Sequence, residues 1–205
     1  MNTAQFFHYV QDAPWYSHFL QPVVDTVQTL QQNARILDVG TGAGKLLELG
    51  LSQTSFQWEG ADTDEDMLSE ARKCISLQNT PLHVIPPNIL PFENSTFDAV
   101  TFCSILFLLP NPAPLLEEAV RVLRPGGRIV ALTPTGIGQM TPEVIKQIGI
   151  YPQNWTFFLW RQMTSGSGRM WAQNGTLASF AQLKNAQYHK QVVFHGFAVI
   201  EWIVF

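Results

Sequence analysis

The residues with the clearest capacity for chemistry form a glycine-rich turn that begins with a carboxylate. The turn, Asp38-Val39-Gly40-Thr41-Gly42-Ala43-Gly44, lies between a predicted strand and a predicted helix. Glycines permit positive φ angles and let a ligand approach the backbone, and the N–H groups that begin the next helix point into the same space. An ordinary tight turn is the alternative. Because three alternate glycines exceed what such a turn requires, we predict a ligand-binding site.

The spacing and charge of this turn separate two classes of cofactor. A dinucleotide-binding turn has the pattern G-x-G-x-x-G, which would place its third glycine at position 45. That position holds Lys45, and the third glycine is Gly44. Asp38 would repel a pyrophosphate and attract an ammonium group. The turn therefore favours a ligand with a positive head and no phosphate, and an NAD-dependent oxidoreductase is the weaker alternative.

A second carboxylate, Asp62, closes the next predicted strand. It follows the glycine turn at about the 20-residue distance at which dinucleotide sites place a ribose-binding acid. The same contact serves adenosine, because a carboxylate accepts hydrogen bonds from both ribose hydroxyls. The alternative role is a helix N-cap, for which Asp64 is better placed. We therefore expect Asp62 to bind a ribose.

The string from Ile36 to Gly44 resembles motif I of the class I S-adenosylmethionine-dependent methyltransferases, which is acidic-x-Gly-x-Gly-x-Gly. The resemblance implies that S-adenosylmethionine is the cofactor and that Asp38 anchors its aminoacyl end. Gly40, Thr41 and Gly42 would then border the cofactor. Further matches in the family's order extend the resemblance over residues 34–134.

Two of these matches concern the adenine. Residues 60–68 resemble the family's second motif, which places Thr63 and Met67 against the ring, although Met67 suits the hydrophobic core equally well. Residues 88–92 resemble the third motif and make Asn88 and Ile89 neighbours of the adenine. The family more often has an acidic residue at the position of Asn88. An amide carbonyl can still accept a hydrogen bond from the exocyclic amine.

Two further contacts are expected outside these motifs. Cys103 ends the fourth predicted strand and should face the cofactor, but it has no base near it in the sequence. The opening segment commonly covers the cofactor as a lid in this family, and Tyr16 is the contact expected from it. The family often has a histidine shortly after the fourth strand, whereas residues 105–110 contain none. The catalytic residues are therefore unassigned, and a non-catalytic cofactor-binding partner or regulatory protein is the alternative function.

Strand-like and helix-like segments alternate over the first two thirds of the chain. Strands are expected at 34–39, 56–61, 82–85, 97–103 and 128–132, and helices at 6–29, 45–51, 64–75 and 114–123. This alternation predicts an α/β fold with a parallel sheet and helices on both faces. The resemblance implies a doubly wound, mostly parallel, seven-stranded sheet of the Rossmann-like methyltransferase type. Ligands of such sheets bind beyond the carboxyl ends of the strands.

A single domain is expected for 205 residues. Its parts would be a helical lid (1–33), a cofactor-binding core (34–134) and substrate-side helices with a terminal hairpin (135–205). Residues 133–175 are interpreted as short helices and loops, 176–185 as a helix, and 188–194 and 198–205 as an antiparallel hairpin. The alternative is one helix to His195 and a single last strand. Four aromatic residues would either line an apolar substrate pocket or pack over the sheet: Trp155, Phe158, Trp160 and Trp171.

Composition narrows the function classes. Lys and Arg total 12 against 16 Asp and Glu, with no basic stripe, which argues against a nucleic-acid partner. The 46% of hydrophobic and 14% of charged residues exclude disorder. No apolar run approaches the length of a membrane span, and neither the two cysteines nor the histidines have metal-ligand spacing. We expect a cytoplasmic methyltransferase of a small, apolar or aromatic molecule, without a metal, nucleic-acid or membrane partner.

Overall fold

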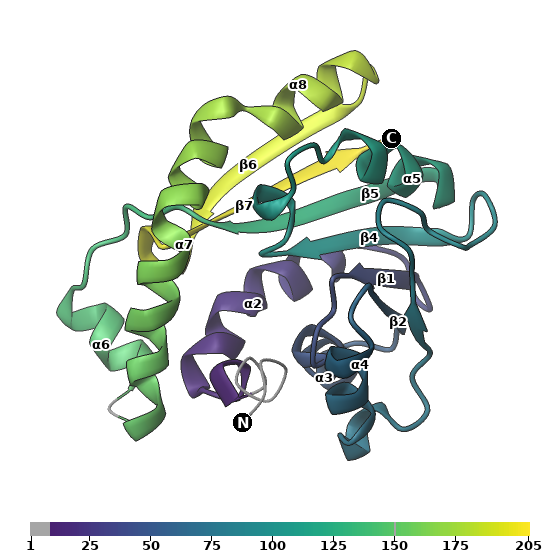
Figure 1. Cartoon of the computed structure of the whole chain (residues 1–205). Coiled ribbons are helices and arrows are strands. Elements are labelled where there is room, and N and C mark those ends of the chain that lie inside the picture. Colours follow the sequence, from purple (N-terminus) through teal and green to yellow (C-terminus); the bar gives the residue numbers. More distant parts are fainter. Residues whose placement is uncertain (1–8, 150) are drawn as a thin grey trace.

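Short β-branched and apolar segments pair into one seven-stranded sheet in the computed structural model, which describes residues 9–149 and 151–205 (Figure 1). Five strands are parallel: β1 (Arg35–Val39), β2 (Gln57–Asp62), β3 (Leu82–Val84), β4 (Phe97–Cys103) and β5 (Leu123–Pro134). The last two, β6 (Gln187–Val193) and β7 (Ala198–Val204), form an antiparallel hairpin whose second strand pairs with β5. The predicted fold class and terminal hairpin are confirmed, and the alternative of a single last strand is wrong.

The strand order β3-β2-β1-β4-β5-β7-β6 creates the switch point of the sheet. From β1 the chain proceeds outward to β3 and then returns to β4 on the other side of β1. Asp38 of β1 lies opposite Thr101 of β4, and Val39 lies opposite Phe102. Ligands of doubly wound sheets bind at the carboxyl ends of such a pair of strands. The sequence places its glycine turn directly after β1.

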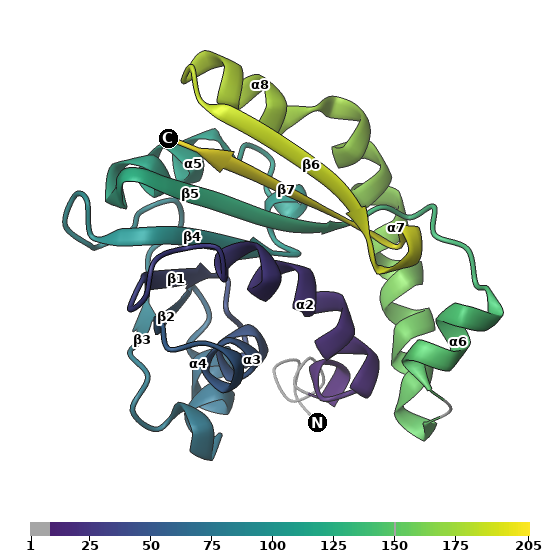
Figure 2. The ribbon, with the colours of Figure 1, turned by 180° about the vertical axis from the view of Figure 1, so that it is seen from behind.

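Helices cover both faces of the sheet (Figures 1 and 2). Residues of α2 (Pro14–Val27), α3 (Lys45–Gln53) and α4 (Glu65–Arg72) join one apolar cluster, and residues of α5 (Ala113–Val122) and α8 (Thr176–Leu183) join the other. The remaining helices are α6 (Pro142–Ile148), α7 (Trp155–Asn174) and the short η1 (Ile75–Leu77), η2 (Leu106–Leu108), η3 (Pro152–Asn154) and η4 (Phe194–Gly196).

The helix α2 belongs to the core. Trp15, Phe19, Val23 and Val27 recur at four-residue spacing on one side of it, and each is fully buried. The indole N–H of Trp15 also donates to Thr156 Oγ1 at 2.9 Å. The part of the predicted lid over residues 14–27 is therefore fixed by packing, and residues 1–8 lie outside the described residues.

The helix α7 is one continuous helix of 20 residues, where the sequence predicted short helices and loops. The prediction is therefore wrong for residues 155–174, whereas the part of the segment before α7 does consist of loops and the short helices α6 and η3. The helix is apolar on more than one side and has Gly166 and Gly168 in its middle, so it lacks the amphipathic period that marks a helix in a sequence. Phe157 and Trp160 pack into the apolar cluster that contains the α2 residues, whereas Trp171 packs into the cluster on the other face of the sheet.

The strand β5 begins five residues earlier than predicted. Residues 125–127, between the predicted helix and the predicted strand, belong to β5, because this strand already pairs with β4 at Leu123. The register shifts between this pair and the next one, which indicates a β-bulge. Gly126 has a φ of +82° there, and its N–H donates to the carbonyl of Phe205 at 2.8 Å. The glycines thus keep an irregular strand within the sheet.

Candidate functional site

The glycine turn after β1 is held by hydrogen bonds to the end of β2. Gly40 and Gly42 have φ angles of +73° and +57°, in the region that favours glycine. The N–H groups of Gly40 and Thr41 donate to the Ala61 carbonyl at 2.8 and 3.1 Å. A Cβ atom on Gly40 would lie 2.6 Å from Ile105 Cγ2, so any other residue would require the Ile105 side chain to shift. The backbone of the turn is therefore fixed by hydrogen bonds to β2, and the N–H groups that donate in them are not free to bind a ligand.

Asp38 is a buried carboxylate directly below this turn. It is 2% exposed, and Thr101 Oγ1 donates to its Oδ1 at 2.7 Å. Burial raises the pKa of Asp38 to about 7, although the Thr101 hydrogen bond opposes the shift. No ion pair joins Asp38 to a cationic side chain among the described residues. A buried carboxylate that lacks a protein cation is suited to receive one from a ligand.

Asp62 ends β2 and faces the same turn. Its Oδ2 accepts from the Gly42 N–H at 2.8 Å, and its Oδ1 accepts from the Asp64 N–H at 3.0 Å. Asp64 caps α4 by accepting from the N–H groups of Asp66 and Met67, as the sequence predicted. A carboxylate has about four acceptor sites, so Asp62 retains capacity for ribose hydroxyls. Its assignment to ribose stays a prediction.

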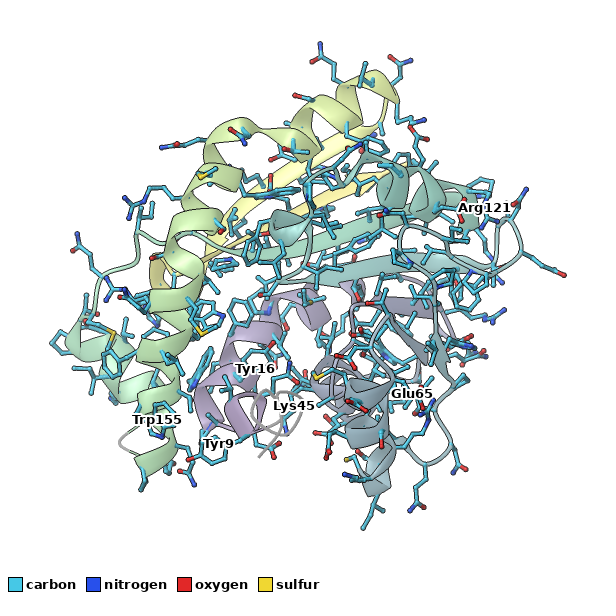
Figure 3. The ribbon with its side chains drawn as sticks, in the orientation of Figure 1. Tyr9, Tyr16, Lys45, Glu65, Arg121 and Trp155 are labelled. Carbon is cyan, nitrogen blue, oxygen red and sulfur yellow. The ribbon has the colours of Figure 1, made fainter. Side chains whose placement is uncertain are left out.

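A cavity of about 30 Å³ lies at the carboxyl ends of β1 and β4. Five of the predicted site residues line it together: Tyr16, Asp38, Gly40, Thr41 and Cys103. Figure 3 shows Tyr16 and Lys45, which also lines the cavity, approaching each other from two different helices. This volume holds about one water molecule, because Gln11, Tyr16 and Leu20 fill the space above the strands.

The residues around this cavity are chemically suited to S-adenosylmethionine. Asp38 supplies a buried carboxyl group without an ion pair to a cationic side chain among the described residues, and a ligand ammonium would favour its charged form. The Gln11 Oε1 and Ser104 Oγ atoms are buried, and neither has a hydrogen-bond partner among the described residues. Buried polar atoms of this kind ordinarily have partners, so both are available to a polar ligand. No group of metal-ligating side chains occurs in the parts of the chain that the structure describes.

Tyr16 and Cys103 are neutral at physiological pH. Burial raises the pKa of Tyr16, and the nearby Cys103 and Asp38 add to the shift. Burial, followed by Asp38, also raises the pKa of the Cys103 thiol well above its usual value. A buried thiol with a raised pKa is a poor nucleophile. Neither side chain is therefore equipped to remove a proton from a substrate or to attack it.

Four lining residues were not predicted from the sequence: Gln11, Leu20, Lys45 and Leu46. The sequence does not mark Gln11 as a site residue, because an isolated glutamine belongs to no recognisable motif. Lys45 was used only to exclude a dinucleotide turn, yet its Nζ pairs with Asp12 Oδ1 and Glu48 Oε2, both at 2.9 Å. The pair with Asp12 joins the opening segment to the start of α3, whereas the pair with Glu48 lies within α3. The charge of Lys45 beside a glycine turn was the available clue.

The remaining predicted residues lie outside the cavity lining. Met67 is close to it, since its Cε would be 3.0 Å from a Cβ atom on Gly42. Thr63 and Asn88 are exposed, and Ile89 is 53% exposed. The structure does not bring these three against the turn, and their adenine contacts stay predictions. No histidine lines the cavity within the described ranges.

Comparison with known proteins agrees with this geometry. Residues 37–131 match the family model described as a methyltransferase domain. The ubiquinone/menaquinone biosynthesis C-methyltransferase UbiE of Desulfotalea psychrophila is 39% identical over 102 residues, covering 49% of this chain and 42% of that protein. The demethylmenaquinone methyltransferase of Shouchella clausii is 30% identical over 171 residues, covering 75% of this chain and 68% of that protein. The chain thus spans less than half of the first relative's length.

A solved structure extends the likeness over the whole fold. The SAM-dependent methyltransferase of Aquifex aeolicus superimposes with a TM-score of 0.65 at 18% identity, covering 100% of this chain and 99% of that one. None of the described helices is long and apolar enough to span a bilayer. The motifs, the sheet topology and the relatives lead to one assignment: this chain belongs to the class I S-adenosylmethionine-dependent methyltransferases.

Proposed function

We propose that this chain binds S-adenosylmethionine at the β1–β4 crevice and transfers its methyl group to a ring carbon of a small quinone-type acceptor. The observation that carries the proposal is Asp38, a buried carboxylate at the switch point of the sheet that has no ion pair to a cation in the described part of the chain. The acceptor class is supported by the names of the two curated relatives, a ubiquinone/menaquinone C-methyltransferase and a demethylmenaquinone methyltransferase.

Each predicted site residue has a role in this proposal. Asp38 holds the ammonium of the cofactor, and Asp62 accepts from its ribose hydroxyls. Gly40, Thr41 and Gly42 border the aminoacyl part. Thr63, Met67, Asn88 and Ile89 contact the adenine. Cys103 at the end of β4 and Tyr16 on α2 lie near the reacting end of the cofactor. When bound, the cofactor supplies an electrophilic methyl group, and the chain contributes by holding it in line with the acceptor carbon.

Cofactor binding requires the cavity to enlarge. Small-molecule sites measure about 300–1,000 Å³, whereas this cavity measures about 30 Å³. Since α2 is anchored in the core, residues 9–13 are the described part of the opening segment that would move aside and close again. Gln11 belongs to that segment, and the Lys45–Asp12 pair holds it to α3. The lid was predicted over residues 1–33, and this proposal restricts it to residues that precede α2.

The acceptor supplies its own nucleophile. Tyr16 and Cys103 have raised pKa values, and no histidine among the described residues lines the cavity. A reduced quinone with an ionised ring hydroxyl would attack through a ring carbon without a protein base. The methyl–sulfur bond would break as the carbon–methyl bond forms, S-adenosylhomocysteine would leave, and the hydrogen on that carbon would be lost to water as a proton. The rate of transfer should therefore increase with pH in step with ionisation of the acceptor hydroxyl.

Two measurements test the proposal. Calorimetric titration with S-adenosylhomocysteine should give a single site, and titration with NAD should give no heat; NAD binding alone would favour the oxidoreductase. Transfer of labelled methyl from S-adenosylmethionine to reduced, short-chain benzoquinones and naphthoquinones should then be detected. Binding without transfer to these acceptors or to a metabolite extract would support the non-catalytic alternative. The Asp38→Asn variant is the negative control in both measurements.

A further inference from the structure

The outer side of α7 is an open apolar face. The helix packs through Phe157, Trp160, Gly168 and Trp171, which are buried. Four large apolar side chains lie on the side away from these contacts, and their exposed fractions are 49% for Trp155, 56% for Phe158, 58% for Met163 and 63% for Met170. At 3.6 residues per turn they fall within about 140° of the helix circumference and extend over about 22 Å. We call these four residues the outer face of α7.

Aromatic side chains continue this face at the start of the helix. Tyr9 is 39% exposed, and its ring centroid lies 6.3 Å from that of Trp155 (Figure 3). Tyr151 is 54% exposed and lies just before α7, while Ile145 on α6 is 46% exposed. Tyr and Trp combine an apolar ring with a polar atom, which suits them to the boundary between lipid and water.

The charge around the outer face differs from that of the rest of the molecule. Residues 135–175 carry a net charge of +2, from Lys146, Arg161 and Arg169 against Glu143. The remainder of the chain carries −6, because the whole chain has −4. Lys146 and Arg169 are exposed. An apolar helix face flanked by basic side chains complements a surface that is apolar and anionic.

We propose that the outer face of α7 binds the surface of an anionic lipid bilayer. The apolar side chains of α7 would enter the boundary between headgroups and acyl chains, and Lys146 and Arg169 would face lipid phosphates. This surface attachment involves no spanning helix. It differs from the expectation, drawn from composition, that the protein has no membrane partner. It depends on neither the cofactor nor the acceptor proposed above.

The test uses the full chain without cofactor or acceptor. Flotation with phosphatidylcholine vesicles that contain phosphatidylglycerol should recover the protein, and vesicles of phosphatidylcholine alone should recover much less. The triple variant Phe158→Gln, Met163→Gln, Met170→Gln should reduce binding by at least about tenfold. Leu183→Gln and Ile75→Gln are matched controls, since these side chains are 81% and 82% exposed elsewhere on the surface. Both control variants should bind as the unchanged protein does.

Three outcomes would overturn the proposal. The first is the absence of vesicle binding by the unchanged chain. The second is an equal loss of binding in the triple variant and in the two controls. The third is a dimer that the triple variant dissociates, without vesicle binding, which would assign the face to a second copy of the chain. Thermal melting of each variant confirms folding, because exposed substitutions change stability little. Cofactor titration is measured separately, so failure here leaves the methyltransferase proposal intact.

Discussion

The two ends of the parallel strands use buried carboxylates in opposite ways. At the amino ends, Asp98 Oδ2 accepts from the Arg35 N–H and from Arg124 Nη1, both at 2.8 Å. At the carboxyl ends, neither Asp38 nor Asp62 has an ion pair to a cationic side chain among the described residues. The first arrangement joins β1, β4 and β5, whereas the second leaves negative charge for a ligand. Asp98 and Asp38 are both buried, whereas Asp62 is partly buried. The presence of a protein cation distinguishes the structural carboxylate from the two candidate ligand-binding ones.

The largest expected effect is on the pH dependence of stability. Because burial raises the pKa of Asp38 from its ordinary value of 3.8 to about 7 in the folded state, the folded state binds the extra proton between these pH values. Its contribution to stability is complete below pH 4 and is lost as the pH rises to about 7. Urea unfolding of Asp38→Asn should match the unchanged protein near pH 4 and exceed it by roughly 4 kcal/mol at pH 8, at 1.36 kcal/mol per unit. Parallel pH profiles would refute a buried charge at this position.

The same substitution should weaken cofactor binding. Removing one partner of a buried charge pair costs about 2–5 kcal/mol, so S-adenosylhomocysteine should bind Asp38→Asn about a hundredfold more weakly by calorimetry. The comparison variant Asp98→Asn should keep its affinity within about threefold. An equal loss of affinity in the two variants would show that the carboxylates at the two ends of the sheet do not differ in ligand binding.

The amino-end carboxylate should matter for stability. Asp98→Ala leaves the Arg35 N–H and the Arg124 guanidinium without their acceptor, and loss of such a partner costs about 1–3 kcal/mol. We expect a decrease of about 2 kcal/mol in the free energy of unfolding, measured with urea at pH 7. A decrease that vanishes in high salt would show that the backbone hydrogen bond contributes little.

The smallest expected effect concerns Asp62. Asp62→Ala should weaken adenosine-containing ligands about tenfold through the lost ribose hydrogen bonds. It also removes the acceptor of the Gly42 N–H, so a thermal melt is needed beside each titration. Methionine alone should bind the variant and the unchanged protein equally. An unchanged affinity for adenosine would mean that Asp62 serves only to hold the turn.

The cofactor half of the molecule was predictable from sequence for a physical reason. A glycine turn, a carboxylate after β2 and alternating strands are local patterns that each carry one chemical requirement. Gln11 and Leu20 reach the site only through tertiary packing, and neither has a local signature. The helix α7 was not predicted, because apolar residues lie on several sides of it and the 3.6-residue hydrophobic period that identifies a helix is therefore absent. The adenine contacts follow from resemblance alone.

The terminal hairpin has a consequence for how the chain assembles. Strand β6 pairs only with β7, and β7 pairs with both β6 and β5. The earlier strand cannot join the sheet until the later one has been synthesised and inserted between its neighbours. Order in the chain and order of assembly are therefore reversed at this edge. A truncation that removes residues 198–204 would detach β6 together with β7 and leave β5 as an exposed, aggregation-prone edge strand.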